Sequence, residues 1–317
     1  MSGLTTTASS SSALPGGGDT DRLALSFEIF PPRTEAAESR LWGELRKLER
    51  LSPRFASVTY GAGGSTRDRT KAMAARIGAE TTMRPAAHLT CVGATRREVD
   101  DIARDYWRAG IRHIVALRGD PETEAAAYTP YPGGYAYAAD LVAGLKRVAD
   151  FEISVAGYPE VHPEAADWSA DLDNLKRKLD AGATRVITQF FFDPQCFLRY
   201  LDRARAAGIH VPIVPGIMPI LNFERTKAFA ARCGAAIPPW LHALFDGLAP
   251  DAATRHLVAA VAAAEQCRQL RAHGIRAFHF YTLNQADLTA AICRILRSPV
   301  LRADPAGNVN LAPTGRA

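Results

Sequence analysis

Residues 179–190 read LDAGATRVITQF, in which a helical pattern ends at Gly182 and a β-branched strand begins. Glycine closes a helix in the left-handed conformation without a Cβ clash. The same helix–glycine–strand joint recurs at Gly110, Gly208 and Gly274. Four copies of one joint indicate a repeated β-α unit.

Strand-like segments alternate with longer segments of helical period from Leu23 onward. We predict eight strands, at residues 23–30, 55–60, 86–91, 113–117, 153–156, 185–190, 213–216 and 277–281. We predict helices near residues 35–51, 66–79, 96–109, 137–148, 171–181, 196–207, 222–233, 253–273 and 287–296.

This alternation predicts the fold class. Eight β-α units in one chain close into a barrel more naturally than they form an open sheet, so we expect an α/β fold that is a single (β/α)8 TIM barrel. A doubly wound open sheet is the alternative. Its first strand-to-helix turn needs glycines around a phosphate, whereas Phe30 is followed here by Pro31, Pro32 and Arg33.

Composition bounds the domains and partners. The chain has 317 residues, of which 47% are hydrophobic and 22% charged, with a net charge of +5 and no long block of one sign. We therefore expect no nucleic-acid partner. We assign residues 1–20, rich in Ser, Thr and Gly, to a disordered tail, residues 21–300 to the catalytic barrel and residues 301–317 to a C-terminal tail.

Targeting and cysteine signals are sparse. Residues 1–20 resemble neither a signal peptide nor an anchor, and no run approaches the ~20 apolar residues of a membrane span, so we expect a cytoplasmic protein without a membrane partner. The five cysteines are scattered and never form a C-x-x-C pair. We expect reduced thiols, no disulfide framework and no zinc site.

The barrel prediction locates the chemistry, because active sites of such barrels lie at the carboxyl ends of the strands. The residues that this rule selects are Glu28, Thr59, Tyr60, His88, Arg118, Gly119, Asp120, residues 158–162, Gln189 and residues 281–284.

Glu28 has an apolar strand around it, with Phe27 and Phe30 nearby. Apolar surroundings disfavour the charged form of a carboxyl, so Glu28 is a candidate general acid. The alternative is a strand-end carboxylate paired with a basic neighbour.

Other features each have two interpretations. The Arg118-Gly119-Asp120 turn follows a strand and could hold a polar ligand, or it could be an ordinary polar turn. The basic run at residues 176–178 suits a phosphate, or it is a solvated helix face. The long segment from Asp120 to Tyr137 could cover a flat aromatic ligand, or it could be a packed surface loop.

A metal-dependent hydrolase is a further alternative, because His88 and His279 lie on strands. The sequence has no metal-binding spacing of histidines, so we expect no metal.

At these positions the chain resembles the methylenetetrahydrofolate reductase family, in its bacterial form with the catalytic domain only. The matching motifs run in order along the chain, at residues 26–32, 57–62, 88–91, 117–120, 156–163, 174–178, 187–193 and 278–284; all but 174–178, which lies in a predicted helix, include residues of a predicted strand.

The resemblance implies a flavoenzyme of folate metabolism. It implies that FAD is held without a Rossmann motif, and that NADH or NADPH reduces the flavin and leaves before 5,10-methylenetetrahydrofolate takes the hydride. The product, 5-methyltetrahydrofolate, would supply methyl groups for methionine synthesis. The resemblance also implies a homo-oligomer, and related bacterial enzymes suggest a tetramer.

The resemblance implies roles for individual residues. Glu28 would be the general acid that opens the bridged folate to an iminium cation, and Asp120 would stabilise that cation. The FAD-binding positions would be Thr59, Tyr60, Ala62, His88, Arg118, Gly119, Asp120, Ala138, Tyr158, His162, Ala165, Asp171, Asn174, Arg177 and Lys178. The substrate-binding positions would be Gln189, Arg225, Phe229 and Gln285.

Two of these positions depart from the family pattern. An arginine that helps to bind substrate is usual where this chain has Gln285, and a neutral polar residue is common where it has Arg225. These departures keep open a second class of function, a non-catalytic flavin- or folate-binding protein.

Overall fold

The computed structural model describes residues 23–61, 66–120, 128–248 and 252–298. The two predicted tails, residues 1–20 and 301–317, lie wholly outside these residues, and so does Ala62.

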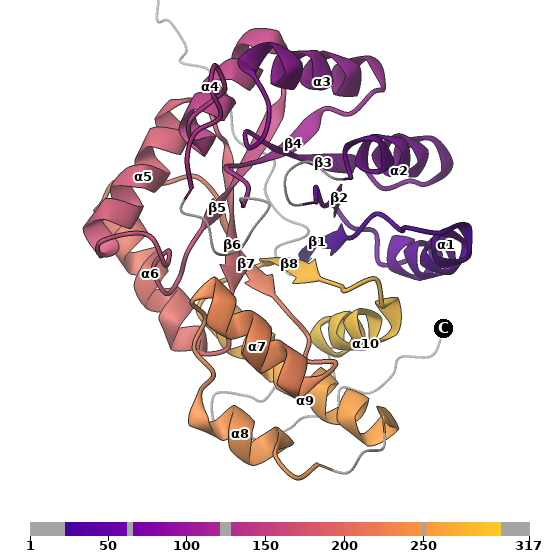
Figure 1. Cartoon of the computed structure of the whole chain (residues 1–317). Coiled ribbons are helices and arrows are strands. Elements are labelled where there is room, and N and C mark those ends of the chain that lie inside the picture. The colour runs from indigo at the N-terminus through magenta and orange to yellow at the C-terminus, as the bar shows by residue number, and fades with distance from the viewer. Residues whose placement is uncertain (1–22, 62–65, 121–127, 249–251, 299–317) are drawn as a thin grey trace, which may run out of the picture.

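Eight parallel strands form a closed barrel in the order β1 to β8, with the helices around it (Figure 1). The prediction of a (β/α)8 barrel is therefore confirmed. The strands are β1 (Ala24–Ile29), β2 (Phe55–Val58), β3 (Pro85–Thr90), β4 (His113–Leu117), β5 (Glu152–Gly157), β6 (Arg185–Phe190), β7 (Ile213–Ile217) and β8 (Ala277–Tyr281).

Helices follow the strands as the periodicity predicted, with shifts at their ends. They are α1 (Glu35–Glu49), α2 (Arg67–Glu80), α3 (Arg96–Arg108), α4 (Ala138–Val148), α5 (Trp168–Asp180), α6 (Pro194–Ala206), α7 (Phe223–Cys233), α8 (Pro239–Phe245), α9 (Ala252–Ala272) and α10 (Ala286–Arg297). The sequence analysis missed α8, because seven residues are too few to show a helical period. It also started α5 too late, because Asp167 caps the helix by accepting a hydrogen bond from Ala170 N.

The glycine joints have the conformation that the sequence predicted. The φ angles of Gly110, Gly182, Gly208 and Gly274 are +81°, +116°, +81° and +87°. Each glycine lets the chain leave a helix and enter the next strand within a few residues.

Alternate strand residues supply two separate apolar clusters. On β1, Leu25, Phe27 and Ile29 pack into the large cluster between the strands and the helices. The smaller cluster consists of strand residues alone and fills the barrel interior; its members are Phe55, Ala86, Val115 and Ile187, with Leu117 against them. Because side chains of a strand point alternately to its two faces, Ser26 and Glu28 also point inward.

The barrel interior contains polar side chains below the site. His113 Nε2 lies 2.8 Å from Ser154 Oγ, and the His113 ring meets Phe55 edge to face at 4.5 Å. Burial lowers the pKa of His113 to about 3. This imidazole is therefore neutral and serves the packing of the amino-terminal half of the barrel.

The described residues contain neither a membrane-spanning helix nor a metal-binding cluster. None of their helices is long and apolar enough to cross a membrane. Nor do they contain a group of three or more His, Cys, Asp or Glu side chains that could hold a metal ion.

The buried His113 predicts a pH-dependent contribution to stability. Its folded pKa lies below its ordinary value of 6.5, so the unfolded chain binds a proton that the folded chain excludes. This contribution is present above pH 6.5 and is lost as the pH falls toward about 3. We expect His113→Gln to lower the free energy of unfolding at neutral pH, with a difference from the wild type that shrinks on acidification. Urea unfolding at several pH values measures this, and a difference that does not change with pH would contradict it.

Candidate active site

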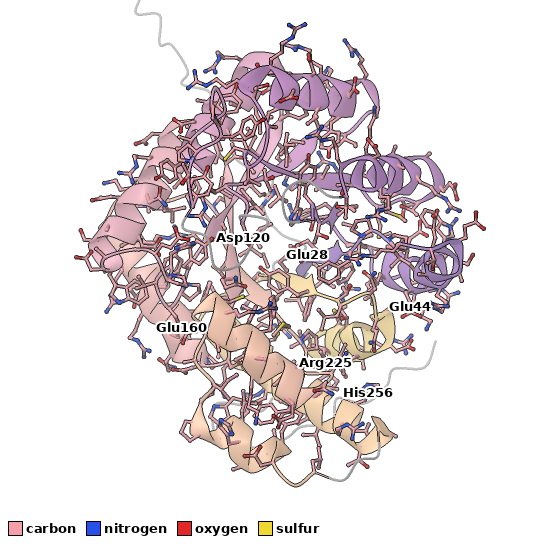
Figure 2. All side chains as sticks on the ribbon, viewed as in Figure 1. Glu28, Glu44, Asp120, Glu160, Arg225 and His256 are labelled. Carbon is pink, nitrogen blue, oxygen red and sulfur yellow. The ribbon has the colours of Figure 1, made fainter. Side chains whose placement is uncertain are left out.

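The candidate acids lie at the same end of the barrel. Glu28 is the fifth residue of β1, and Asp120 follows the end of β4 by three residues. Figure 2 shows both near the centre of the ring of strands, where the carboxyl ends converge. The barrel rule had predicted this end.

Glu28 is almost buried, with its side chain 12% exposed. Its Oε2 lies 3.4 Å from Nε2 of His88 on β3 and 4.0 Å from Nε2 of His279 on β8. His279 Nδ1 in turn lies 2.8 Å from Ser26 Oγ, two residues before Glu28 on the same strand. Two imidazoles therefore flank the carboxyl.

The two histidines leave polar atoms unused. His88 Nε2 and His279 Nε2 are buried and make no hydrogen bond within the described part of the chain. Burial lowers the pKa of His88, although Glu28 acts in the opposite direction. A buried polar atom without a hydrogen bond is costly, so these atoms favour a polar ligand beside Glu28.

Tyr281 forms the wall next to Glu28, because the two residues pair across β1 and β8. Its hydroxyl donates to Thr188 O at 2.7 Å. The ring passes over Gly216, where a Cβ would come within 2.6 Å of the ring and 2.2 Å of Thr188 O. Gly216 thus lets the tyrosine cross β7, and burial raises the Tyr281 pKa.

Arg118 is held on several sides. Both of its terminal nitrogens donate to the Glu164 carboxylate, one of them at 2.9 Å, and its guanidinium lies 4.4 Å from the centre of the Tyr128 ring. Gly119 has a φ of +89°, and a Cβ there would lie 2.7 Å from Val92. The backbone of this turn therefore packs directly on the residues that follow β3.

Asp120 is exposed, with its side chain 89% accessible. Its charge contributes to the raised pKa values of Tyr158 and Cys233, which burial mainly causes. Asp120 therefore acts electrostatically toward the loop after β5 and the end of α7, across the mouth of the barrel.

The loop after β5 joins several FAD-binding candidates to α5. The rings of Tyr158 and His162 meet edge to face at 4.5 Å, and His162 N donates to the buried Asp171 at 3.3 Å. Lys178 is also buried and donates to Ala156 O at 2.7 Å. Burial lowers the Lys178 pKa to about 8, with Asp171 opposing the shift.

The remaining FAD-binding candidates lie around the same end. Tyr60 Oη accepts a hydrogen bond from Arg67 Nε at 3.0 Å, and Thr59 O accepts one from Thr70. The other candidates are Ala138 at the start of α4, Ala165 after His162, and Asn174 and Arg177 on α5, whose side chains lie 3.5 Å apart.

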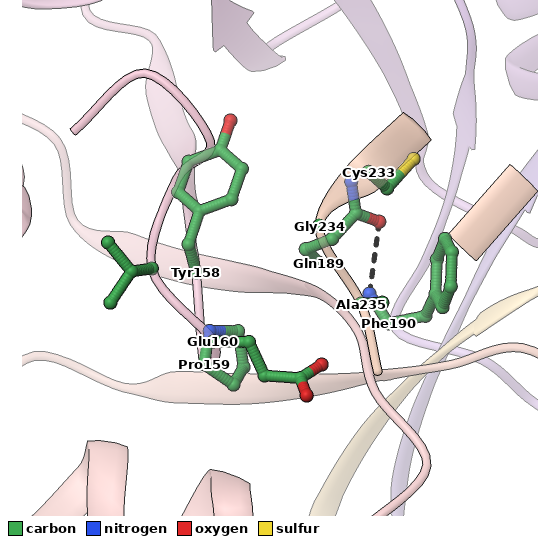
Figure 3. A pocket seen from close by; sticks show the side chains of 9 residues that line it. Tyr158, Pro159, Glu160, Gln189, Phe190, Cys233, Gly234 and Ala235 are labelled. Atoms are coloured by element: carbon green, nitrogen blue, oxygen red, sulfur yellow. Dashed lines mark hydrogen bonds between the residues drawn. The ribbon is translucent and has the colours of Figure 1, made fainter. Parts of the chain in front are cut away.

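Gln189 and Phe229 lie on neighbouring elements. Gln189 Oε1 accepts a hydrogen bond from Phe190 N at 3.0 Å, beside a small hollow (Figure 3). The Phe229 ring stacks on Phe190 at 5.2 Å. The residues lining the hollow are Tyr158, Pro159, Glu160, Val161, Gln189, Phe190, Cys233, Gly234 and Ala235.

Arg225 and Gln285 are exposed and are not bonded to the other candidates in the described residues. Arg225 is exposed in the first turn of α7, and Gln285 is the exposed residue that precedes α10. No hydrogen bond or ion pair in the described residues joins either side chain to the other candidates.

Sequence reasoning missed several residues that shape the site. Glu164, Thr188 and Gly216 act on the candidates only through contacts between distant segments, as described above. Glu160 lies in the range 158–162 that the barrel rule had selected, and His279 had been considered only as a metal ligand, so the contacts of neither side chain were predicted.

Comparisons with known proteins identify the family. A family model described as methylenetetrahydrofolate reductase matches residues 17–297. The 5,10-methylenetetrahydrofolate reductases of Salmonella typhimurium and Escherichia coli are each 52% identical over 277 residues, covering 87% of this chain and 91% of theirs.

Two further relatives extend the comparison. "Methylenetetrahydrofolate reductase (NADH) 1" of Arabidopsis thaliana is 37% identical over 272 residues, covering 82% of this chain and 46% of the plant protein. An uncharacterized protein from Clostridium thermocellum that binds two copies of 5-methyl-5,6,7,8-tetrahydrofolic acid shares the fold, with a TM-score of 0.57, 13% identity and coverage of 88% and 95%. The chain belongs to the methylenetetrahydrofolate reductase family.

Proposed function

We propose that this protein reduces 5,10-methylenetetrahydrofolate to 5-methyltetrahydrofolate with NADH or NADPH through a bound FAD. The observation that carries the proposal is the Glu28 carboxyl, enclosed by two imidazoles at the barrel end that also bears Asp120. The names of the bacterial relatives support the same reaction. A role in supplying methyl groups, a homo-oligomer and a cytoplasmic location stay predictions.

The residues at this end fit a flavin dinucleotide. Within the described residues, His88 Nε2 is buried and makes no hydrogen bond, and the backbone at Gly119 packs against Thr90 and Val92. Arg118, His162 and Arg177 supply donors for phosphate or ribose oxygens. Bound FAD would supply two-electron exchange between a nicotinamide and a folate. The residues proposed to hold it are the set that the sequence analysis named.

Glu28 supplies the proton in this proposal. The substrate carries a methylene bridge between two nitrogens, and protonation of one nitrogen breaks its bond to the bridging carbon. The result is an iminium cation that accepts hydride to become a methyl group. Glu28 is placed for this role because its side chain is only 12% exposed and lies between His88 and His279.

Asp120 and the aromatic wall complete the proposal. A carboxylate near the mouth favours the cation electrostatically. Gln189 would bond the edge of the pterin, and Phe229, stacked on Phe190, would cover its face. These groups orient the substrate for hydride transfer.

The flavin spectrum tests the proposed reaction. We expect purified protein to be yellow, to lose its visible absorbance when NADH or NADPH is added without oxygen, and to regain it when 5,10-methylenetetrahydrofolate follows. A yellow protein that neither nicotinamide bleaches would instead be the non-catalytic binding protein that Gln285 had suggested.

Glu28→Gln tests the acid. We expect the variant to accept electrons from the nicotinamide at a near-normal rate and to reduce the folate at least ~10²-fold more slowly, because only the second half-reaction needs the proton. Stopped-flow measurement of each half-reaction decides this, with Glu265→Gln on the surface of α9 as control. An equal loss in both half-reactions would rule out the assigned role.

Arg225→Gln tests the substrate edge. Arg225 stands in the first turn of α7, where the helix dipole disfavours a cation, and its neighbour Glu224 pairs with Lys227 at 2.8 Å instead. It is also one helical turn from Phe229, so it can reach the glutamate tail of a stacked folate. We expect about a tenfold weaker affinity for tailed folates, restored in part by Gln285→Arg. Equal losses for a tail-less pteroate analogue would show that the tail is not what Arg225 binds.

A further inference from the structure

Glu160 joins two segments that are far apart in the sequence. It lies in the loop after β5, and both of its carboxylate oxygens lie 3.1 Å from Ala236 N, just beyond α7. Figure 3 shows Glu160 at the hollow beside Gln189, next to the segment through Gly234 and Ala235. The carboxylate therefore ties the β5 loop to the carboxyl end of α7.

The backbone on both sides of this tie is constrained. Val161, the next residue, has a φ of +71°, which a β-branched residue rarely adopts. Gly234 has a φ of +70°, and a Cβ there would lie 3.0 Å from Pro163. Strained backbone persists only where its surroundings hold it, and the Glu160–Ala236 bond is one such contact.

The tie continues into α7. Gly234 N and Ala235 N both donate to Ala230 O, so the end of α7 and the segment bonded to Glu160 form one unit. Phe229 precedes Ala230 and stacks on Phe190 at 5.2 Å. A displacement of Ala236 would thus move the end of α7 and, with it, the Phe229 ring.

The surroundings of Glu160 have opposing effects on its charged form. The carboxyl is partly buried, and burial raises its pKa. From α6, Asp193 raises it further, while Arg199 lowers it. The bond from Ala236 N also lowers this pKa, so it favours the charged form that the tie uses.

We propose that Glu160 is a positioning residue for substrate binding, which acts through α7 by holding the helix end that sets Phe229 against Phe190. This role rests on the proposed function only for the identity of the substrate. Glu160 itself contacts the loop and the helix and takes no part in proton transfer.

Hydrogen exchange tests the tie directly. In FAD-loaded protein without substrate, we expect Glu160→Ala to speed amide exchange over residues 223–236. Glu160→Gln should do so less, because its amide oxygen can still accept from Ala236. Glu224→Gln, on the exposed side of α7, is the matched control and should change nothing there. Unchanged exchange in Glu160→Ala would overturn the proposal, and Glu160→Gln decides the question if the alanine variant does not fold.

Kinetics test the route through Phe229. We expect Glu160→Ala to raise KM for the folate about tenfold, equivalent to 1.4 kcal/mol of binding, while kcat and FAD content stay near the wild-type values. In a Phe229→Ala background, Glu160→Ala should add little. Fully additive effects, or a loss of FAD in place of the change in KM, would overturn the proposal. If the wild type reduces no folate, the proposed function fails, whereas the exchange experiment still decides the role of Glu160.

Discussion

The site depends on the closure of the barrel between β1 and β8. Asn284 secures this seam by accepting from Phe30 N at 2.8 Å and donating to Phe30 O at 2.9 Å, and Thr282 Oγ1 donates to Glu28 O at 2.7 Å. The turn that carries these side chains has positive φ angles at Leu283 and Asn284, so backbone strain is retained there. Without this closure Glu28 would lose His279 as a neighbour, and the carboxyl would be open to water.

The histidines at the two ends of the barrel interior differ in their hydrogen bonding. Toward the amino ends of the strands, His113 is neutral and partnered by Ser154, so its polar atom costs little. Toward the carboxyl ends, His88 and His279 keep Nε2 atoms without partners in the described chain, facing Glu28 at 3.4 and 4.0 Å. Unsatisfied buried groups lower stability, and they are retained where a ligand or a proton completes them.

Different interactions hold the two sides of the barrel mouth. On the β4–β5 side, charge-assisted contacts such as the pair between Arg118 and Glu164 hold the loops in place. On the β6–β8 side, aromatic rings line the mouth: Phe229 stacks on Phe190, and Phe190 meets Tyr281 edge to face. The proposed tie through Glu160 connects these sides, because it leaves the β5 loop and ends at α7. A planar substrate between the two sides would contact both.

Local periodicity predicted the eight strands and nearly all helices, and glycines marked the joints where a helix ends and a strand begins. The barrel that these elements form then predicted which end carries the site. Motif resemblance also identified the family. Only the tertiary structure decided which side chains meet: Glu28 with His88 and His279, Arg118 with Glu164, and Glu160 with Ala236. These contacts join residues dozens to hundreds of positions apart, and their distances depend on closure, register and side-chain packing, which no local pattern encodes.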